Sequence, residues 1–179
     1  MSRWVALLPL VAIAALAILF ATFGLHHDPH VQPTALVGKQ MPDLTLPSLD
    51  DATPVRLRDA LKDGPVVVNF YASWCGPCEL DQPALLGIRD RGVHVIGISY
   101  EDVPPRGAHE KTRAFLARLG DPFLIRVTDD DGRAGIDFGI TGVPETYLVG
   151  RDGKILAKRT GPLGQEEARL LALQALAAR

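Results

Sequence analysis

Two cysteines, Cys75 and Cys78, are the residues of this sequence whose type and spacing point most directly to chemistry. They are the only cysteines in the 179-residue chain and are separated by Gly76 and Pro77, so their pairing is local and cannot clamp distant parts of a fold. A thiolate attacks a disulfide, and a cysteine at the N-terminus of a helix is stabilised as the anion by free backbone N–H groups and the helix dipole. The spacing therefore predicts a redox-active pair.

We expect Cys75 to be the nucleophile and Cys78 the resolving thiol. Cys78 follows by about one helical turn, near enough to attack the mixed disulfide formed by Cys75 and to release the partner reduced. Pro77 lacks an N–H group that the first turn of a helix does not use, so proline suits this position. Such a pair is also half of a zinc site, but the sequence holds no second pair to complete one. Redox chemistry is therefore favoured, with no metal and no bound cofactor.

Composition excludes some classes of protein. The chain is 47% hydrophobic with a formal net charge of −2, which supports neither a nucleic-acid-binding nor a disordered protein. Its length allows one ordinary domain plus an appendage.

The N-terminal residues 1–25 are expected to form a transmembrane anchor. Residues 4–25 carry no charge, and about 20 apolar residues suffice to cross a bilayer as a helix. Arg3 precedes this segment and no Lys or Arg follows until Lys39, so the positive-inside rule places the N-terminus in the cytoplasm. A cleaved signal peptide is the alternative, although its apolar region is usually shorter. Either way, the rest of the chain lies outside the cytoplasm.

Residues 26–38 begin with a polar stretch, 26–33, that contains two prolines and suits an extended linker. Three histidines in this segment, His26, His27 and His30, invite a metal interpretation, but they do not form a complete ligand set. We therefore assign the segment as a linker and residues 39–179 as the folded domain.

Short strands alternate with helices in this domain. Val66–Tyr71 is a nearly continuous apolar run rich in β-branched residues, typical of a strand covered on both faces, and is expected at the centre of the sheet. Core-facing spacing predicts a helix over 77–89, and 93–98 forms the next strand, parallel to the first if the helix is a right-handed crossover.

The second half of the domain is also predicted to alternate helices and strands. A helix ending at Leu119 and a short strand at 123–127 are followed by a hairpin, whose strands 146–149 and 155–158 flank a turn with two glycines. A final helix covers 165–178. The expected fold is α/β, a mixed sheet flanked by helices on both faces.

Three segments carry a family resemblance. Residues 69–78, which contain Trp74-Cys75-Gly76-Pro77-Cys78, resemble the active-site segment of the thioredoxin superfamily. More narrowly, residues 38–44 and the segment Gly142-Val143-Pro144-Glu145-Thr146 resemble the DsbE/CcmG family of cytochrome c maturation. The resemblance covers residues 38 to about 178.

This resemblance implies a thioredoxin-like fold in which Pro144 is cis and faces the cysteines. Backbone groups of Val143 would then pair with an extended substrate. Trp74, Gly76 and Pro77 are expected to support the cysteine pair as parts of the motif.

The sequence departs from thioredoxin at Asn69, where thioredoxin carries a buried aspartate. An amide cannot accept the proton that the second thiol must release, so another base or a water must serve. We expect Glu145, beside Pro144, to tune the redox properties of the cysteine pair. Four further acidic residues could surround the site, although each is more simply explained as a solvated charge: Glu79, Asp81, Glu101 and Asp102.

These features predict a single-pass protein of the bacterial inner membrane whose domain faces the periplasm. The resemblance to the DsbE/CcmG family implies that it reduces a disulfide in the Cys-x-x-Cys-His motif of apocytochrome c or in a maturation partner. Because no dinucleotide fingerprint is present, electrons would come from a transmembrane thiol donor of the DsbD/CcdA type. A general periplasmic reductase of the TlpA/ResA type is a close alternative. A copper-binding chaperone with a thioredoxin-like fold is a more distant one, because such proteins space their cysteines by one residue more.

Overall fold

The computed structural model describes residues 8–24 and 36–178, which belong to two compact units. The first contains α1 (Leu8–Gly24), a helix of 17 residues. Across the described ranges, no helix combines the length and the apolar character needed to cross a membrane. The expected anchor and linker also include residues 1–7 and 25–35, which lie outside the described residues.

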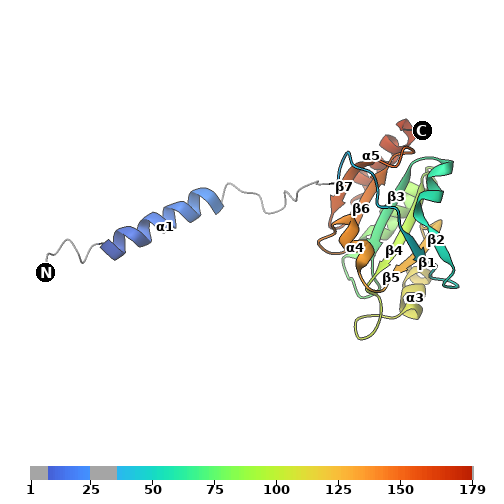
Figure 1. Ribbon diagram of the computed structural model, residues 1–179, viewed down its shortest axis with the longest axis horizontal. Coiled ribbons are helices and arrows are strands. Elements are labelled where there is room, and N and C mark those ends of the chain that lie inside the picture. The colour runs from blue at the N-terminus through green and yellow to red at the C-terminus, as the bar shows by residue number, and fades with distance from the viewer. Residues whose placement is uncertain (1–7, 25–35, 179) are drawn as a thin grey trace. The chain divides into compact units, whose positions relative to one another are not determined.

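Five strands of the second unit form one mixed sheet in the order β5-β4-β3-β6-β7 (Figure 1). Their bounds are β3 Val66–Tyr71, β4 His94–Tyr100, β5 Ile125–Asp129, β6 Glu145–Val149 and β7 Ile155–Thr160. β4 pairs in parallel with both β3 and β5, whereas β6 is antiparallel to β3 and to β7. The predicted central strand, parallel crossover and C-terminal hairpin are confirmed.

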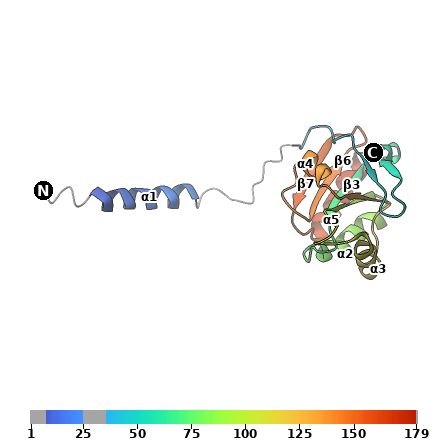
Figure 2. The same cartoon turned by 60° about the horizontal axis from the view of Figure 1, so that its bottom comes forward.

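Helices cover both faces of the sheet, as predicted. Their bounds are α2 Cys78–Asp90, α3 His109–Leu119, α4 Arg133–Phe138 and α5 Gln165–Ala177. One hydrophobic cluster joins α2, α3 and α5 to one face, and a second cluster joins α4 to the other. In Figure 2, α4 lies on one side of the sheet, and α2 and α3 lie on the other.

Several short elements were not predicted. β1 (Thr45–Pro47) and β2 (Pro54–Arg56) form an antiparallel pair, and a 3₁₀ helix, η2, follows at Leu57–Asp63. α4 has only six residues and lies between Gly132 and Gly139, both in the left-handed conformation. These elements are shorter than the windows over which hydrophobic periodicity is informative.

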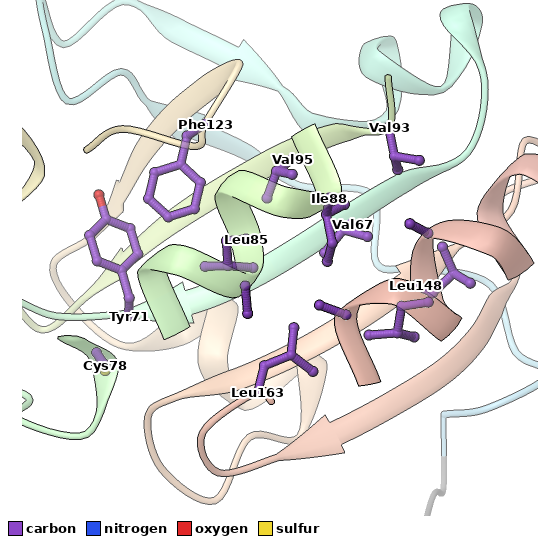
Figure 3. Close-up of a cluster of buried hydrophobic side chains, with 14 of the residues drawn as sticks. Val67, Tyr71, Cys78, Leu85, Ile88, Val93, Val95, Phe123, Leu148 and Leu163 are labelled. Carbon is purple, nitrogen blue, oxygen red and sulfur yellow. The ribbon is translucent and has the colours of Figure 1, made fainter. Parts of the chain in front are cut away.

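Side chains of β3 alternate between the two clusters, so that Val67 and Tyr71 face α2 while Val68 and Phe70 face the opposite side. Figure 3 shows Val67 and Tyr71 in the first cluster. The register of β3 against β6 places Asn69 opposite Thr146 and Phe70 opposite Glu145.

Because side chains alternate along a strand, Asn69 and Thr146 lie on the α2 face of the sheet, whereas Glu145 lies on the other face. This difference decides which polar residues can reach the start of α2.

The C-terminal end of β3 is packed by aromatic rings. Tyr71 stacks on Phe123 with ring centroids 4.7 Å apart. A Cβ atom at Gly97 would lie 2.6 Å from that Phe123 ring, so only glycine lets the ring lie against β4. The resulting close packing fixes the point at which β3 passes into the turn before α2.

Candidate active site

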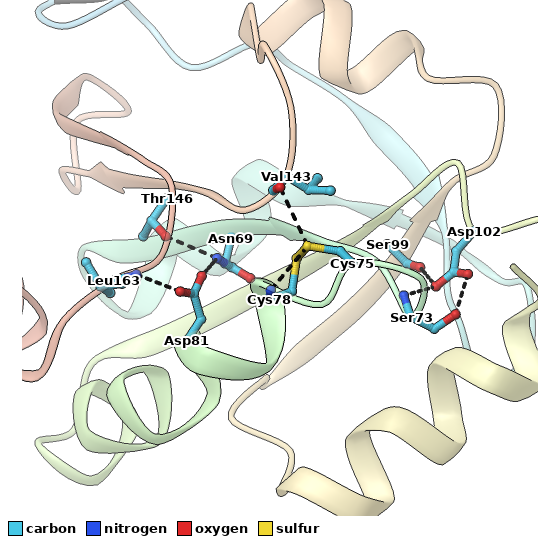
Figure 4. The surroundings of a disulfide bond; sticks show 10 residues. All are labelled: Asn69, Ser73, Cys75, Cys78, Asp81, Ser99, Asp102, Val143, Thr146 and Leu163. Carbon is cyan, nitrogen blue, oxygen red and sulfur yellow. Dashed lines mark hydrogen bonds between the residues drawn. A yellow bond between two sulfur atoms is a disulfide. The ribbon is translucent and has the colours of Figure 1, made fainter. Parts of the chain in front are cut away.

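A disulfide joins Cys75 and Cys78 between the end of β3 and the start of α2 (Figure 4). The helix begins at Cys78, and Cys75 lies in the preceding turn, so that the N–H group of Cys78 donates a hydrogen bond to the Cys75 sulfur at 3.2 Å. Cys75 is 5% exposed and Cys78 is fully buried. Of the two residues, only Cys75 has exposed surface, and the donated N–H group would stabilise its thiolate.

The segment before β6 lies against this sulfur. The peptide bond between Val143 and Pro144 is cis, as expected. The carbonyl oxygen of Val143 lies 3.5 Å from Cys75 Sγ, and Gly161 donates a backbone hydrogen bond of 2.9 Å to the carbonyl oxygen of Pro144. The structure therefore brings the two cysteines, Val143 and Pro144 together from distant parts of the sequence.

Exposed apolar side chains flank the disulfide in sequence on either side. Trp74 is 38% exposed and Leu80 is 68% exposed. Gly76 has open space where a Cβ atom would be, and Pro77 caps α2 with helical backbone angles. At Gly76 a protein segment that approaches Cys75 would meet no side chain, and Trp74 offers it an exposed apolar surface.

A polar network lies on the α2 side of the sheet. Asp81 is 1% exposed, and its carboxylate accepts hydrogen bonds from the backbone N–H of Leu163 at 2.6 Å and from the Asn69 amide at 3.5 Å. Asn69 also donates to Thr146 Oγ1 at 3.1 Å. Burial raises the pKa of Asp81 to about 6, although the hydrogen bonds from Leu163 and Asn69 act to lower it.

Asp81 follows Cys78 by three residues, so both side chains occupy the buried face of α2 about one turn apart. A carboxylate with a pKa near neutrality is suited to accept a proton from a thiol and to return it. Asn69 cannot do so, but its amide orients the carboxylate that can. Asp81 is thus a buried base about one helical turn from the resolving cysteine.

The structure does not bring Glu145 to the disulfide. Its carboxylate is fully buried and accepts hydrogen bonds from Thr141, through the backbone N–H and Oγ1, and from the hydroxyl of Tyr147. Lys158 completes this network with an ion pair of 2.8 Å. All of these contacts lie away from α2, so Glu145 anchors the segment that carries Pro144 without facing the cysteine pair.

The other acidic residues divide into two kinds. Glu79 and Glu101 form surface ion pairs with Arg118 and Arg106. The expectation of a solvated charge is wrong for two residues, Asp81 and Asp102, which are both buried.

Sequence reasoning could have found Asp81, because it follows Cys78 by three residues on one helical face. The burial of Asp102 had no comparable signal, because its partners include Ser73 and Thr112, which are distant in sequence. In the part of the chain that the structure describes, no cluster of three His, Cys, Asp or Glu residues is arranged to hold a metal.

Comparison with known proteins agrees with this geometry. The redoxin family matches residues 36–173. The chain is 41% identical over 159 residues to the thiol:disulfide interchange protein DsbE of Allochromatium vinosum, covering 88% of this chain and 84% of that protein. It is 38% identical over 141 residues to the thiol:disulfide interchange protein HelX of Rhodobacter capsulatus, covering 78% and 77% respectively.

The chain belongs to the DsbE family of thiol:disulfide interchange proteins. The crystal structure of a DsbE from Chlorobium tepidum superposes with a TM-score of 0.65 at 27% identity, covering 79% of this chain and 96% of that one. Membership in the DsbE family and the thioredoxin-like fold, both expected from the sequence, are confirmed. The protein is a thiol-disulfide oxidoreductase with one Cys-x-x-Cys pair.

The raised pKa of Asp81 predicts a pH-dependent stability. Between pH 4 and 6 the folded protein retains a proton that the unfolded chain, with an aspartate pKa of 3.8, has released, so this group lowers stability as the pH rises. Asp81→Asn removes the effect. The stability of the variant relative to the natural protein should therefore increase by about 2 kcal/mol between pH 4 and pH 7, measured by urea unfolding of the oxidised proteins.

Glu79→Gln is the matched control, because Glu79 lies on the same helix and its hydrogen bond to Arg118 lowers the pKa of its carboxyl. The stability of Glu79→Gln relative to the natural protein should therefore decrease as the pH rises. A stability difference between Asp81→Asn and the natural protein that stays constant across this range would contradict the assignment.

Proposed function

We propose that this protein is a membrane-anchored reductase that opens a disulfide in the Cys-x-x-Cys-His motif of apocytochrome c or in a thiol protein of cytochrome c maturation. The observation that carries the proposal is the position of the Cys75 sulfur, the more exposed of the pair, beside the Val143 carbonyl and the cis bond to Pro144. An extended segment lying along Val143 would present its disulfide to Cys75. Similarity to DsbE and HelX supports the reaction class.

The reaction begins with the reduced pair. The Cys75 thiolate attacks one sulfur of the partner's disulfide, and the other sulfur leaves as a thiolate. Cys78 then gives its proton to Asp81 and attacks Cys75, which releases the second partner thiolate. The partner gains two electrons and becomes a dithiol, while Cys75 and Cys78 become a disulfide. A transmembrane thiol donor of the DsbD/CcdA type would reduce that disulfide again.

The electrostatics of the site favour a cysteine pair that reduces its partner and is itself oxidised. Above pH 6 the Asp81 carboxylate is largely ionised, and its negative charge next to the pair disfavours a second negative charge on sulfur. A thiol pair whose thiolates are less stabilised is more readily oxidised, which makes it a better reductant. The N–H group that Cys78 donates to Cys75 acts in the opposite direction and keeps enough thiolate for attack.

The supporting residues have separate tasks in this proposal. Trp74 offers an exposed apolar surface to the partner, and Gly76 and Pro77 shape the turn between the cysteines. Val143 and Pro144 receive the substrate segment. Glu145 acts indirectly by holding Thr141 and therefore the segment from residue 141 to the cis bond.

We further propose that residues 1–25 anchor the protein in the bacterial inner membrane, that residues 26–38 are a linker and that residues 39–179 face the periplasm. The uncharged run of residues 4–25 behind Arg3 supports this orientation.

Cys78→Ser is expected to accumulate mixed disulfides through Cys75, because the first attack remains while resolution is lost. The trapped partners should include an apocytochrome c or a thiol protein of its maturation, identified by non-reducing electrophoresis and mass spectrometry from cells that express the variant.

Cys75→Ser is the matched control and should trap no substrate. Adducts that depend on Cys78 would contradict the assigned roles. A broad set of unrelated envelope proteins, without any cytochrome c component, would instead indicate a general reductase of the TlpA/ResA type.

The intact chain should remain in the membrane fraction after a high-salt wash, with its domain open to protease added to spheroplasts. N-terminal sequencing of the mature protein is the companion measurement. A first residue between about 20 and 30 would show cleavage of a signal peptide and would overturn the anchor.

A further inference from the structure

The loop after β4 wraps around the residues that precede Cys75. The indole N–H of Trp74 donates a hydrogen bond to the carbonyl oxygen of Glu101 at 3.3 Å. The guanidinium of Arg106 lies over the Trp74 ring, 5.7 Å from its centroid, and pairs with the Glu101 carboxylate at 2.6 Å. The loop thus holds the side chain next to the nucleophile from two directions.

A buried carboxylate lies beneath this loop. Asp102 has no exposed surface, and its Oδ2 accepts hydrogen bonds from the Ser73 backbone N–H at 2.6 Å, from Thr112 Oγ1 at 2.7 Å and from Ser99 Oγ at 3.3 Å. Its Oδ1 accepts a hydrogen bond of 2.6 Å from Ser73 Oγ. Figure 4 shows Asp102 bound to Ser73 and Ser99 on the Cys75 side of the disulfide. One side chain therefore ties the turn before Cys75 to the end of β4 and to α3.

The loop packs tightly against this carboxylate. A Cβ atom at Gly107 would lie 1.6 Å from Asp102 Oδ1 and 3.1 Å from Trp74 Cδ1. The backbone of the loop therefore lies against both groups and restricts the positions open to Asp102.

We propose that Asp102 is a positioning residue for thiol-disulfide exchange. By fixing both polar groups of Ser73, Asp102 sets the turn that places the Cys75 sulfur 3.2 Å from the Cys78 N–H group and 3.5 Å from the Val143 carbonyl. The N–H contact stabilises the thiolate, so a turn that relaxes raises the pKa of Cys75.

Charge alone would have the opposite effect. A nearby negative charge disfavours a thiolate, so removing a carboxylate without disturbing the turn lowers the thiol pKa. Two substitutions of Asp102 separate the two effects. Asp102→Asn removes the charge but can keep the hydrogen bonds, since its oxygen accepts from the Ser73 N–H and its amide group donates to Ser73 Oγ. Asp102→Ala removes both the charge and the hydrogen bonds.

The experiment measures the pKa of Cys75 in the reduced full-length proteins from the pH dependence of its alkylation by iodoacetamide. We expect this pKa to be about one unit higher in Asp102→Ala than in Asp102→Asn, the effect of one lost hydrogen bond to a thiolate.

Asp102→Ala should reduce oxidised glutathione at pH 7 about threefold more slowly than Asp102→Asn, because the tenfold loss of thiolate is partly offset by the greater nucleophilicity of the thiolate that remains. The reduction potential of the Cys75–Cys78 pair should be more negative in Asp102→Ala than in Asp102→Asn.

Asp129→Ala is the matched control for lost stability. Asp129 is also a buried aspartate at the end of a strand, and its carboxylate accepts hydrogen bonds from the backbone N–H groups of Ala134 and Gly135 in α4. Its substitution should lower the melting temperature as Asp102→Ala does but leave the pKa of Cys75 and the rate unchanged.

Equal pKa values for Cys75 in Asp102→Ala and Asp102→Asn would overturn the proposal, as would an equal change in Asp129→Ala. If Asp102→Ala does not fold, Ser73→Ala decides the question, because it removes only the hydroxyl hydrogen bond of 2.6 Å. It should raise the pKa of Cys75 by a smaller amount, and no change in that pKa would contradict the positioning role.

Discussion

The pairing of β3 with β6 is the interaction on which the site depends. Its register sets Asn69 opposite Thr146, two residues that are 77 positions apart in sequence and that are joined by a side-chain hydrogen bond. The same pairing brings the cis bond before Pro144 to the end of β3, where the chain turns into α2. A shift of one residue in this register would send Thr146 to the opposite face and move Val143 away from the Cys75 sulfur.

Three of the buried carboxylates, Asp81, Asp102 and Glu145, differ in whether a cation lies beside them. Asp81 is held by an amide and a backbone N–H group without a cation. Asp102 accepts hydrogen bonds from neutral groups only, whereas Glu145 has an ion pair with Lys158.

A buried carboxylate without a cation is costly to ionise, which is why burial raises the pKa of Asp81. The site therefore combines a base with a pKa close to neutrality and a rigid turn that carries the nucleophile. The proposed reaction uses both: Asp81 would accept the proton of Cys78, and the turn held by Asp102 would present Cys75.

Much of this arrangement could be predicted from the sequence. The apolar run at 66–71 and the Cys-x-x-Cys motif before a helix indicated a buried central strand that leads into the active-site turn, and the family resemblance indicated the cis bond to Pro144. Local patterns are sufficient there, because the strand, turn and helix are contiguous in sequence.

The roles of the acidic residues could not be predicted in the same way, because burial depends on contacts between distant segments. Glu145 is adjacent to Pro144, yet strand alternation turns its side chain to the face away from α2. Asp102 resembles a solvated loop charge until the fold brings Ser73 and Thr112 around it.

The reduction potential of the Cys75–Cys78 pair is the most direct test of the reductase function, and it is obtained by equilibrating the full-length protein with mixtures of reduced and oxidised glutathione at pH 7. A reductase requires a potential more negative than that of glutathione, so we expect the pair to remain mostly a disulfide even in a large excess of reduced glutathione. A pair that is mostly reduced in an equimolar mixture would be an oxidant, and that result would contradict the proposed reductase function.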